Sequence, residues 1–143
     1  MTATEILELP FLKVIYRKDL NVLIGRWANA VTSEQLYEGY THTLSLAKEY
    51  NVSLWLMDMR MRNVSNQTEK DWFFRNIVPA ISENVKPTFI AYLTLPNQLV
   101  KFGDFYPTQK AFSFSQQLQA SFFVNEKNAF DWLKTCANCL SAA

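Results

Sequence analysis

The segment Val52-Ser53-Leu54-Trp55-Leu56-Met57 is a nearly continuous apolar run that ends at Asp58. A short run that is apolar on both sides of the backbone is typical of a central parallel strand, because helices cover both faces of such a strand. Residues 88–93, Thr-Phe-Ile-Ala-Tyr-Leu, have the same character and are closed by Pro96. These two runs predict the centre of an α/β sheet.

Two further strands are predicted before this centre, at residues 11–17 and 22–27, where β-branched and aromatic residues are frequent. Only the turn-like Lys18-Asp19-Leu20-Asn21 separates them. Because parallel neighbours need a long crossover, a gap this short predicts an antiparallel hairpin at the start of the domain.

Two capping boxes predict the starts of two helices: Thr32 with Gln35, and Asn66 with Glu69. In each box the two side chains satisfy free backbone N–H groups at the helix start. Apolar residues follow both boxes at helical spacing. We expect the first helix to stop at Asn51, since asparagine tolerates the left-handed conformation. Pro79 should kink or end the second helix.

The secondary structure of the C-terminal part, from residue 97 onward, is predicted as follows from the sequence. We expect a loop over residues 97–107, a helix over 108–117, a strand over 119–124, and a last helix capped by Asn125. In that helix Ala129, Trp132 and Leu133 should face inward. The order β-β-α-β-α-β-α-β-α predicts one α/β domain over residues 1–143. Its sheet is mixed and mostly parallel, with an N-terminal antiparallel hairpin and helices on both faces.

The charge balance argues against several classes of partner. The chain of 143 residues has 14 basic and 13 acidic residues, a net charge of +1. Nucleic-acid binders usually carry a clear basic excess, and no run of Lys and Arg indicates a membrane surface. No apolar stretch approaches the roughly 18 residues of a membrane span, and the N-terminus lacks the features of a signal peptide. We therefore expect a cytoplasmic protein.

Residues that usually carry catalysis or bind metal are sparse. The two cysteines, Cys136 and Cys139, are predicted near the end of the last helix, where the helix dipole does not activate a thiol. The only histidine, His42, lies within a predicted helix, so a four-ligand zinc site is not indicated. This pattern predicts no catalytic residue, no metal and no cofactor, and it argues against an enzyme.

The hairpin start, the strand ending in Asp58, and the closing residues 123–126 and 129–133 resemble the SpoIIAA-like, or STAS-like, superfamily. The closing residues read Phe-Val-Asn-Glu and Ala-Phe-Asp-Trp-Leu. The best-known members are anti-sigma factor antagonists, phosphorylated on the first Ser of an Asp-Ser-Ser-Gly stretch. Here the corresponding region is Ser65-Asn66-Gln67-Thr68, without the preceding Asp or the following Gly. Other members are small stand-alone bacterial proteins without a settled function, and this chain resembles those more.

A candidate ligand site follows the strand that ends at Asp58. Ligands of open α/β sheets bind outside the carboxyl ends of the strands. Arg60 and Arg62 lie in the next loop, and a helix start there favours an anion. The predicted ligand residues are Asp58, Arg60, Arg62 and Ser65. Ser65 and Thr68 are candidate phosphoacceptors, or they are simply capping residues.

The chain is rich in aromatic residues, which make up 15% of it. The second half includes seven between residues 102 and 123: Phe102, Phe105, Tyr106, Phe112, Phe114, Phe122 and Phe123. They form the core, an apolar pocket or a dimer face. The resemblance and the absent catalytic residues favour a non-enzymatic regulatory or protein-interaction module, with a protein partner or a homodimer. The alternative is a small-molecule binder, for a lipid-like apolar ligand or an anion at the loop.

Overall fold

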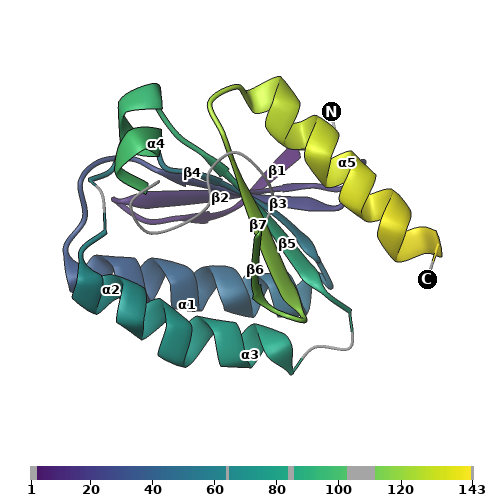
Figure 1. Cartoon of the computed structure of the whole chain (residues 1–143), viewed down its shortest axis with the longest axis horizontal. Coiled ribbons are helices and arrows are strands. Elements are labelled where there is room, and N and C mark those ends of the chain that lie inside the picture. The colour runs from purple at the N-terminus through teal and green to yellow at the C-terminus, as the bar shows by residue number, and fades with distance from the viewer. Residues whose placement is uncertain (1–2, 64, 84–85, 103–111, 143) are drawn as a thin grey trace.

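A computed structural model describes residues 3–63, 65–83, 86–102 and 112–142, with backbone only at 100–102, 112 and 141–142. One mixed sheet has the strand order β1-β2-β3-β4-β5-β7-β6 (Figure 1). The strands are β1 (Ala3–Glu8), β2 (Leu12–Arg17), β3 (Val22–Trp27), β4 (Leu54–Asp58), β5 (Thr88–Leu93), β6 (Phe112–Ser115) and β7 (Leu118–Phe123). The helices are α1 (Ser33–Glu49), α2 (Gln67–Trp72), the π-helical turn η1 (Phe73–Ile77), α3 (Val78–Ser82), α4 (Pro96–Phe102) and α5 (Glu126–Ala142).

The two apolar runs form the centre of the sheet, as predicted. β4 pairs in parallel with β3 on one side and with β5 on the other. Every residue of β4 and of β5 is buried. The hairpin is also confirmed, since β2 and β3 pair antiparallel from Leu12 opposite Trp27 to Arg17 opposite Val22.

Helices cover both faces of the sheet, which confirms that part of the prediction. In Figure 1, α1, α2 and α3 lie below the sheet and α5 lies above it. The core is divided in the same way. Trp27, Trp55 and Met57 belong to the cluster under α1 and α3, whereas Leu56 and Leu93 belong to the cluster under α5. Alternate residues of each strand therefore serve opposite faces.

The sheet is mixed, as predicted, but the prediction that most of its strand pairings are parallel is wrong. Within the described residues, three pairings are parallel and three are antiparallel. The difference comes from two edge strands that the prediction lacked. Residues 3–8 form β1, whose exposed and half-buried residues give no apolar run to detect. At the opposite edge, β6 pairs antiparallel with β7.

The helix predicted over 108–117 is contradicted at 112–117, and residues 108–111 lie outside the described part. Phe112-Ser113-Phe114-Ser115 forms β6, and a turn at 116–117 leads into β7. The alternation of aromatic and serine residues has the period of a strand, which decides the outcome. The loop predicted over 97–107 is likewise wrong at residues 97–102, which belong to α4. Proline is favoured at the first position of a helix, because its missing N–H needs no partner there, and Pro96 begins α4.

The predicted helix boundaries hold at both capping boxes and at Asn51. Thr32 and Asn66 each accept a hydrogen bond from the N3 backbone and form complete boxes. Asn51, which follows the C-cap residue Tyr50 of α1, has a positive φ of 55°. Pro79 does not end its helix, which continues to Ser82. The turn before it is widened instead, because proline has no N–H and its ring crowds the preceding carbonyl groups.

The last strand and the last helix follow the prediction closely. β7 ends one residue before the expected end and pairs in parallel with β5. The Asn125 side chain accepts a hydrogen bond from the N–H of Asn128 at the start of α5. Ala129 and Leu133 are fully buried and Trp132 is half-buried, so this helix presents the expected face to the sheet. Across the described residues, no helix is both long enough and apolar enough to traverse a bilayer.

Candidate functional site

The polar side chains that the sequence singled out gather at one edge of the sheet. β3, β4, β5 and β7 run in parallel, so their carboxyl ends meet there. Asp58 ends β4, and Arg60, Arg62 and Ser65 follow it in the connection to α2. This is the edge at which open α/β sheets bind ligands.

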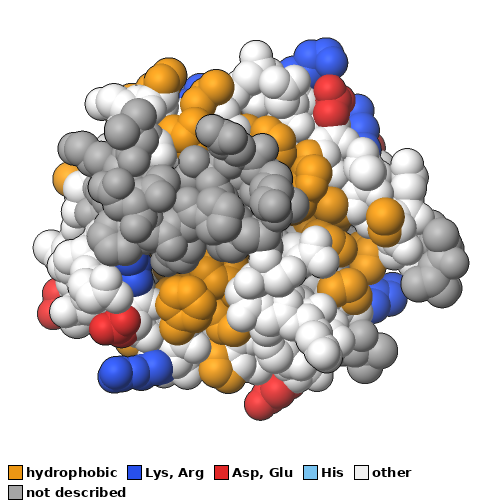
Figure 2. Space-filling view, viewed as in Figure 1, with side chains coloured by type: hydrophobic (Ala, Val, Ile, Leu, Met, Phe, Trp, Pro, Cys, Tyr) orange, Lys and Arg blue, Asp and Glu red, His pale blue; other side chains and the backbone are white. Residues whose placement is uncertain are grey.

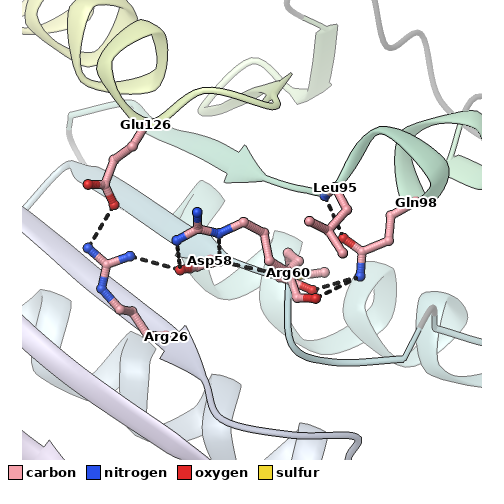
Figure 3. A network of polar contacts seen from close by, with 7 residues as sticks. Arg26, Asp58, Arg60, Leu95, Gln98 and Glu126 are labelled. Atoms are coloured by element: carbon pink, nitrogen blue, oxygen red, sulfur yellow. Dashed lines mark hydrogen bonds and ion pairs between the residues drawn. The ribbon is translucent and has the colours of Figure 1, made fainter.

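Asp58 is the centre of a charged network on the α5 side of the sheet. Figure 3 shows Arg26 from β3 and Arg60 from the loop pointing at its carboxylate from two directions. Arg26 Nη1 and Arg60 Nη2 each lie 2.8 Å from Asp58 Oδ2, and Arg60 Nε lies 2.9 Å from Oδ1. Arg26 also donates to Glu126 Oε1 at 2.8 Å. The network therefore links β3, β4 and the first turn of α5.

The environment of Asp58 favours its ionised form. Burial by itself would raise the pKa of this carboxyl group. The hydrogen bonds from the Arg60 side chain and backbone, together with the one from Arg26, outweigh burial and lower the pKa below its ordinary value. The ion pair with Asp58 in turn raises the pKa of Arg60. Both partners of the pair thus keep their charges.

Replacing Asp58 by asparagine is expected to destabilise the fold by about 2 kcal/mol at pH 7, because two arginines lose a charged acceptor. A carboxyl group with a lowered folded-state pKa contributes its full stabilisation above the unfolded pKa, 3.8 for Asp58, and loses it as the pH falls through the folded value. The difference between wild type and Asp58→Asn should therefore shrink below about pH 4.

Urea unfolding of both proteins between pH 7 and pH 3 measures this difference. Glu126→Gln is the matched control. Its side chain is 43% exposed, so its ion pair with Arg26 should contribute at most about 1 kcal/mol. A difference for Asp58→Asn that stays constant, or grows, on acidification would contradict the account of the network.

Gln98 holds the loop that carries Arg60 and Arg62. Its amide Nε2 donates to the carbonyl oxygens of Met59 at 2.9 Å and of Arg62 at 3.0 Å. Its Oε1 accepts from the N–H of Leu95 at 2.8 Å (Figure 3). Gln98 lies in α4, and its buried amide fixes the path of the backbone after Asp58.

Arg62 turns to the opposite face of the sheet from Arg60. Its side chain is buried, 4% exposed, and its guanidinium lies 5.3 Å from the centroid of the Trp27 ring. Its Nε donates to the carbonyl of Asn63 at 3.0 Å, and Nη2 donates to the hydroxyl of Ser65. Burial lowers the pKa of Arg62 from its ordinary value, whereas the phenol of Tyr40 and the carboxylate of Glu69 act to raise it.

A pocket of about 40 Å³ lies beside Arg62, between α1, α2 and the sheet. It has room for about three water molecules. Its described lining is mostly apolar, with a few polar groups: Leu36, Tyr40, Met59, Ser65, Glu69, Lys70, Phe73, Tyr92, Phe114 and Phe122. Ser65 and Phe114 are partly exposed, which places the mouth of the pocket near them. Figure 2 shows that hydrophobic side chains also gather near the centre of the viewed face.

The structure thus divides the predicted site residues into two groups. Asp58 and Arg60 lie together in the charged network, and Arg62 and Ser65 lie together beside the pocket. The two guanidinium groups do not face one common ligand. Thr68 is exposed in the first turn of α2, and Ser65 is half-buried. Whether any of these residues binds a ligand or accepts a phosphate stays a prediction.

Several residues of both groups were missed by sequence reasoning. Arg26 and Glu126 complete the network. The sequence signal for Arg26 is that it is the one charged residue of the otherwise apolar strand β3, next to the last residue of that strand. Tyr40 and Tyr92 look like core residues in the sequence, and only the fold brings them to Arg62. Of the seven aromatic residues noted above, Phe114 and Phe122 line the pocket and Phe123 packs under α5. Phe105 and Tyr106 lie outside the described residues, as do the side chains of Phe102 and Phe112.

The cysteines and the histidine lie away from both groups. Cys136 is buried in α5, where burial raises the pKa of its thiol to about 11, and Cys139 is exposed. His42 is exposed on α1. In the described part of the chain, no three His, Cys, Asp or Glu side chains are grouped to hold a metal ion.

Comparison with known proteins adds no relative. No family model matches the chain. Searches for similar curated proteins and for similar solved structures give no match either. The function is therefore argued from the site itself.

Proposed function

We propose that this chain is a non-enzymatic binding module that holds a small, largely apolar molecule in the pocket between α1, α2 and the sheet. The observation that carries this proposal is the pocket lining. Five aromatic rings, those of Tyr40, Phe73, Tyr92, Phe114 and Phe122, surround it together with a few polar groups. Small-molecule sites combine mostly apolar walls with a few placed polar groups in this way.

The ionisable side chain at the pocket best suited to catalysis is already engaged. Glu69 accepts hydrogen bonds from the Asn66 N–H at 3.1 Å and from the Ser33 hydroxyl at 2.7 Å. Both carboxylate oxygens thus serve to start α2 and to tie it to α1. This arrangement favours binding over proton transfer, because a general base needs an oxygen within reach of the substrate.

We propose further that the fold belongs to the SpoIIAA-like class and that ligand binding is the input of a regulatory module. The hairpin that leads into parallel strands, Asp58 at the end of β4, and the motif at the start of α5 support this class. A surface for a protein partner or a second copy is favoured by three exposed apolar residues that follow neighbouring strands. Met61, Leu95 and Val124 are 67%, 42% and 48% exposed.

Filling the pocket should abolish ligand binding. Leu36 lines the pocket from α1, so Leu36→Phe occupies the space a ligand would use. The matched control is Leu44→Phe, a half-buried residue of the same helix that is not among the described pocket residues. We expect ethanol and 1-propanol, which match a space of this size, to raise the melting temperature of wild type and of Leu44→Phe by mass action, but not that of Leu36→Phe.

Native mass spectrometry of freshly purified protein, compared with the same sample denatured, is the companion measurement. Extra mass that disappears on denaturation would identify a bound small molecule, and it should be absent from Leu36→Phe. A flat melting temperature for wild type with both alcohols, together with no bound mass, would refute the binding module. An equal shift in Leu36→Phe would show that the ligand binds elsewhere.

A further inference from the structure

A second pocket lies at the other end of the parallel strands, where β4 and β5 begin. This amino-edge pocket has a volume of about 360 Å³, which is within the range of small-molecule sites. Its described lining comes from the end of α1 and from the starts of β4 and β5: Ala47, Lys48, Asn51, Val52, Ser53, Trp55, Lys86 and Thr88. Two of these described residues are lysines and none is acidic, so the charged groups of the lining are positive.

The two lysines have no charged partner in the described part of the chain. Lys48 and Lys86 are both exposed, and none of the ion pairs among the described residues includes either of them. An ammonium group donates hydrogen bonds and accepts none. Because two positive charges line one pocket, they raise its electrostatic potential together and attract an anion.

The backbone oxygens at the end of α1 are already engaged. The last carbonyl groups of a helix form the negative end of its dipole and by themselves disfavour an anion. Three backbone hydrogen bonds occupy these oxygens: Leu46 accepts from Tyr50, Ala47 from Val52, and Lys48 from Asn51. The ammonium of Lys48, in the last turn, also offsets the dipole. The chain therefore satisfies these acceptors internally.

Several donors of the lining, by contrast, remain unpaired. Within the described residues, the buried indole N–H of Trp55 has no hydrogen-bond partner, and the hydroxyl groups of Ser53 and Thr88 make no hydrogen bond. Thr88 is only 2% exposed. An unpaired buried polar group is costly, and a bound molecule can supply the missing partner. The lining thus combines two cations with hydroxyl groups that are free to donate.

We propose that the amino-edge pocket binds the phosphate group of a small phosphate monoester. The charge of such a group, about −2 at neutral pH, matches the two ammonium groups of Lys48 and Lys86. The hydroxyl groups of Ser53 and Thr88 donate to its remaining oxygens, and the body of the ester packs on the wall that includes Trp55. This site lies at the opposite edge of the sheet from Asp58, and the inference does not depend on the proposed function.

Isothermal titration with ribose 5-phosphate and with ribose tests the inference. We expect wild type to bind ribose at least about tenfold more weakly, because ribose lacks the charged group. The double variant Lys48→Gln with Lys86→Gln should lose about tenfold or more in affinity for ribose 5-phosphate. The control is Lys13→Gln with Arg75→Gln, which removes the same charge at exposed positions outside the described lining. It should keep its affinity within about twofold.

Thr88→Val separates an ordered site from attraction by two surface charges. It removes a buried hydroxyl that has no partner in the described residues, so the melting temperature should not fall while the affinity falls several-fold. Equal affinity in Thr88→Val would overturn the proposed site in favour of attraction by the lysines alone.

Three further results would overturn the inference. The first is no binding of ribose 5-phosphate to wild type at millimolar concentration, and the second is equal affinity in the double lysine variant. The third is inorganic phosphate binding as tightly as ribose 5-phosphate, which would assign the site to free phosphate. The alcohols report on the pocket between α1, α2 and the sheet, so the two proposals fail separately.

Discussion

Replacing Trp27 by alanine is expected to lower the free energy of unfolding by about 3–5 kcal/mol, as large-to-small changes of buried aromatic residues do. Trp27 is 1% exposed at the end of β3. Its ring stacks on Phe11 at a centroid distance of 6.4 Å and tilts against Tyr40 at 5.7 Å. The truncation would also remove the aromatic face on which the guanidinium of Arg62 lies.

Urea unfolding at pH 7 measures this loss. The control is Trp72→Ala, because Trp72 is half-buried in α2 and stacks on Tyr37 at 4.4 Å near the surface. Its truncation leaves a groove that water can fill, and no internal cavity. We expect the control to cost less than half as much as Trp27→Ala. Equal losses of unfolding free energy for the two variants would contradict the prediction that Trp27 contributes more to stability than Trp72.

Gly39→Ala is expected to destabilise the protein by about 1–3 kcal/mol, although alanine is the better helix former by about 1 kcal/mol. Gly39 lies in the middle of α1, where the helix approaches β3 closely. A Cβ atom at this position would lie 2.5 Å from Cη2 and 2.9 Å from Cζ3 of Trp27. Since the ring is fully buried, it cannot turn aside without disturbing its neighbours.

A double-mutant cycle tests the cause of this loss. In the background of Trp27→Leu, which removes the far edge of the ring, Gly39→Ala should become neutral or stabilising. Ser45→Ala, an exposed position of the same helix, shows the effect of propensity alone and should stabilise by a few tenths of a kcal/mol. The same loss for Gly39→Ala in both backgrounds would show that the clash with Trp27 is not its origin.

Much of the fold could be predicted from local patterns. The apolar runs at 54–58 and 88–93 became the central parallel strands, and the capping boxes at Thr32 and Asn66 started the two expected helices. These signals are local, because burial on both faces and the pairing of a cap with its N3 residue depend on neighbours in sequence. The N-terminal hairpin was predictable for the same reason.

The edges of the sheet were not predicted, because an edge strand is stabilised by pairing with a distant partner more than by its own composition. β1 consists of exposed and half-buried residues and takes its register from β2. β6 is only four residues long and is held by β7. In both cases the pairing partner, and no apolar run, decides the structure.

The sequence by itself determined the central strands, the helix caps and the placement of Asp58, Arg60, Arg62 and Ser65 in one connection at the edge of the sheet. Only the tertiary structure decided that these residues act apart. Asp58 ends β4 on the α5 face, where it meets Arg26 and α5, whereas the loop after β4, which Gln98 holds, carries Arg62 to the opposite face, where it meets Trp27 and the pocket. The contacts that define the pocket join α1, α2, β5, β6 and β7, elements far apart in the chain. Packing in three dimensions brings them together, and no spacing in the sequence encodes that meeting.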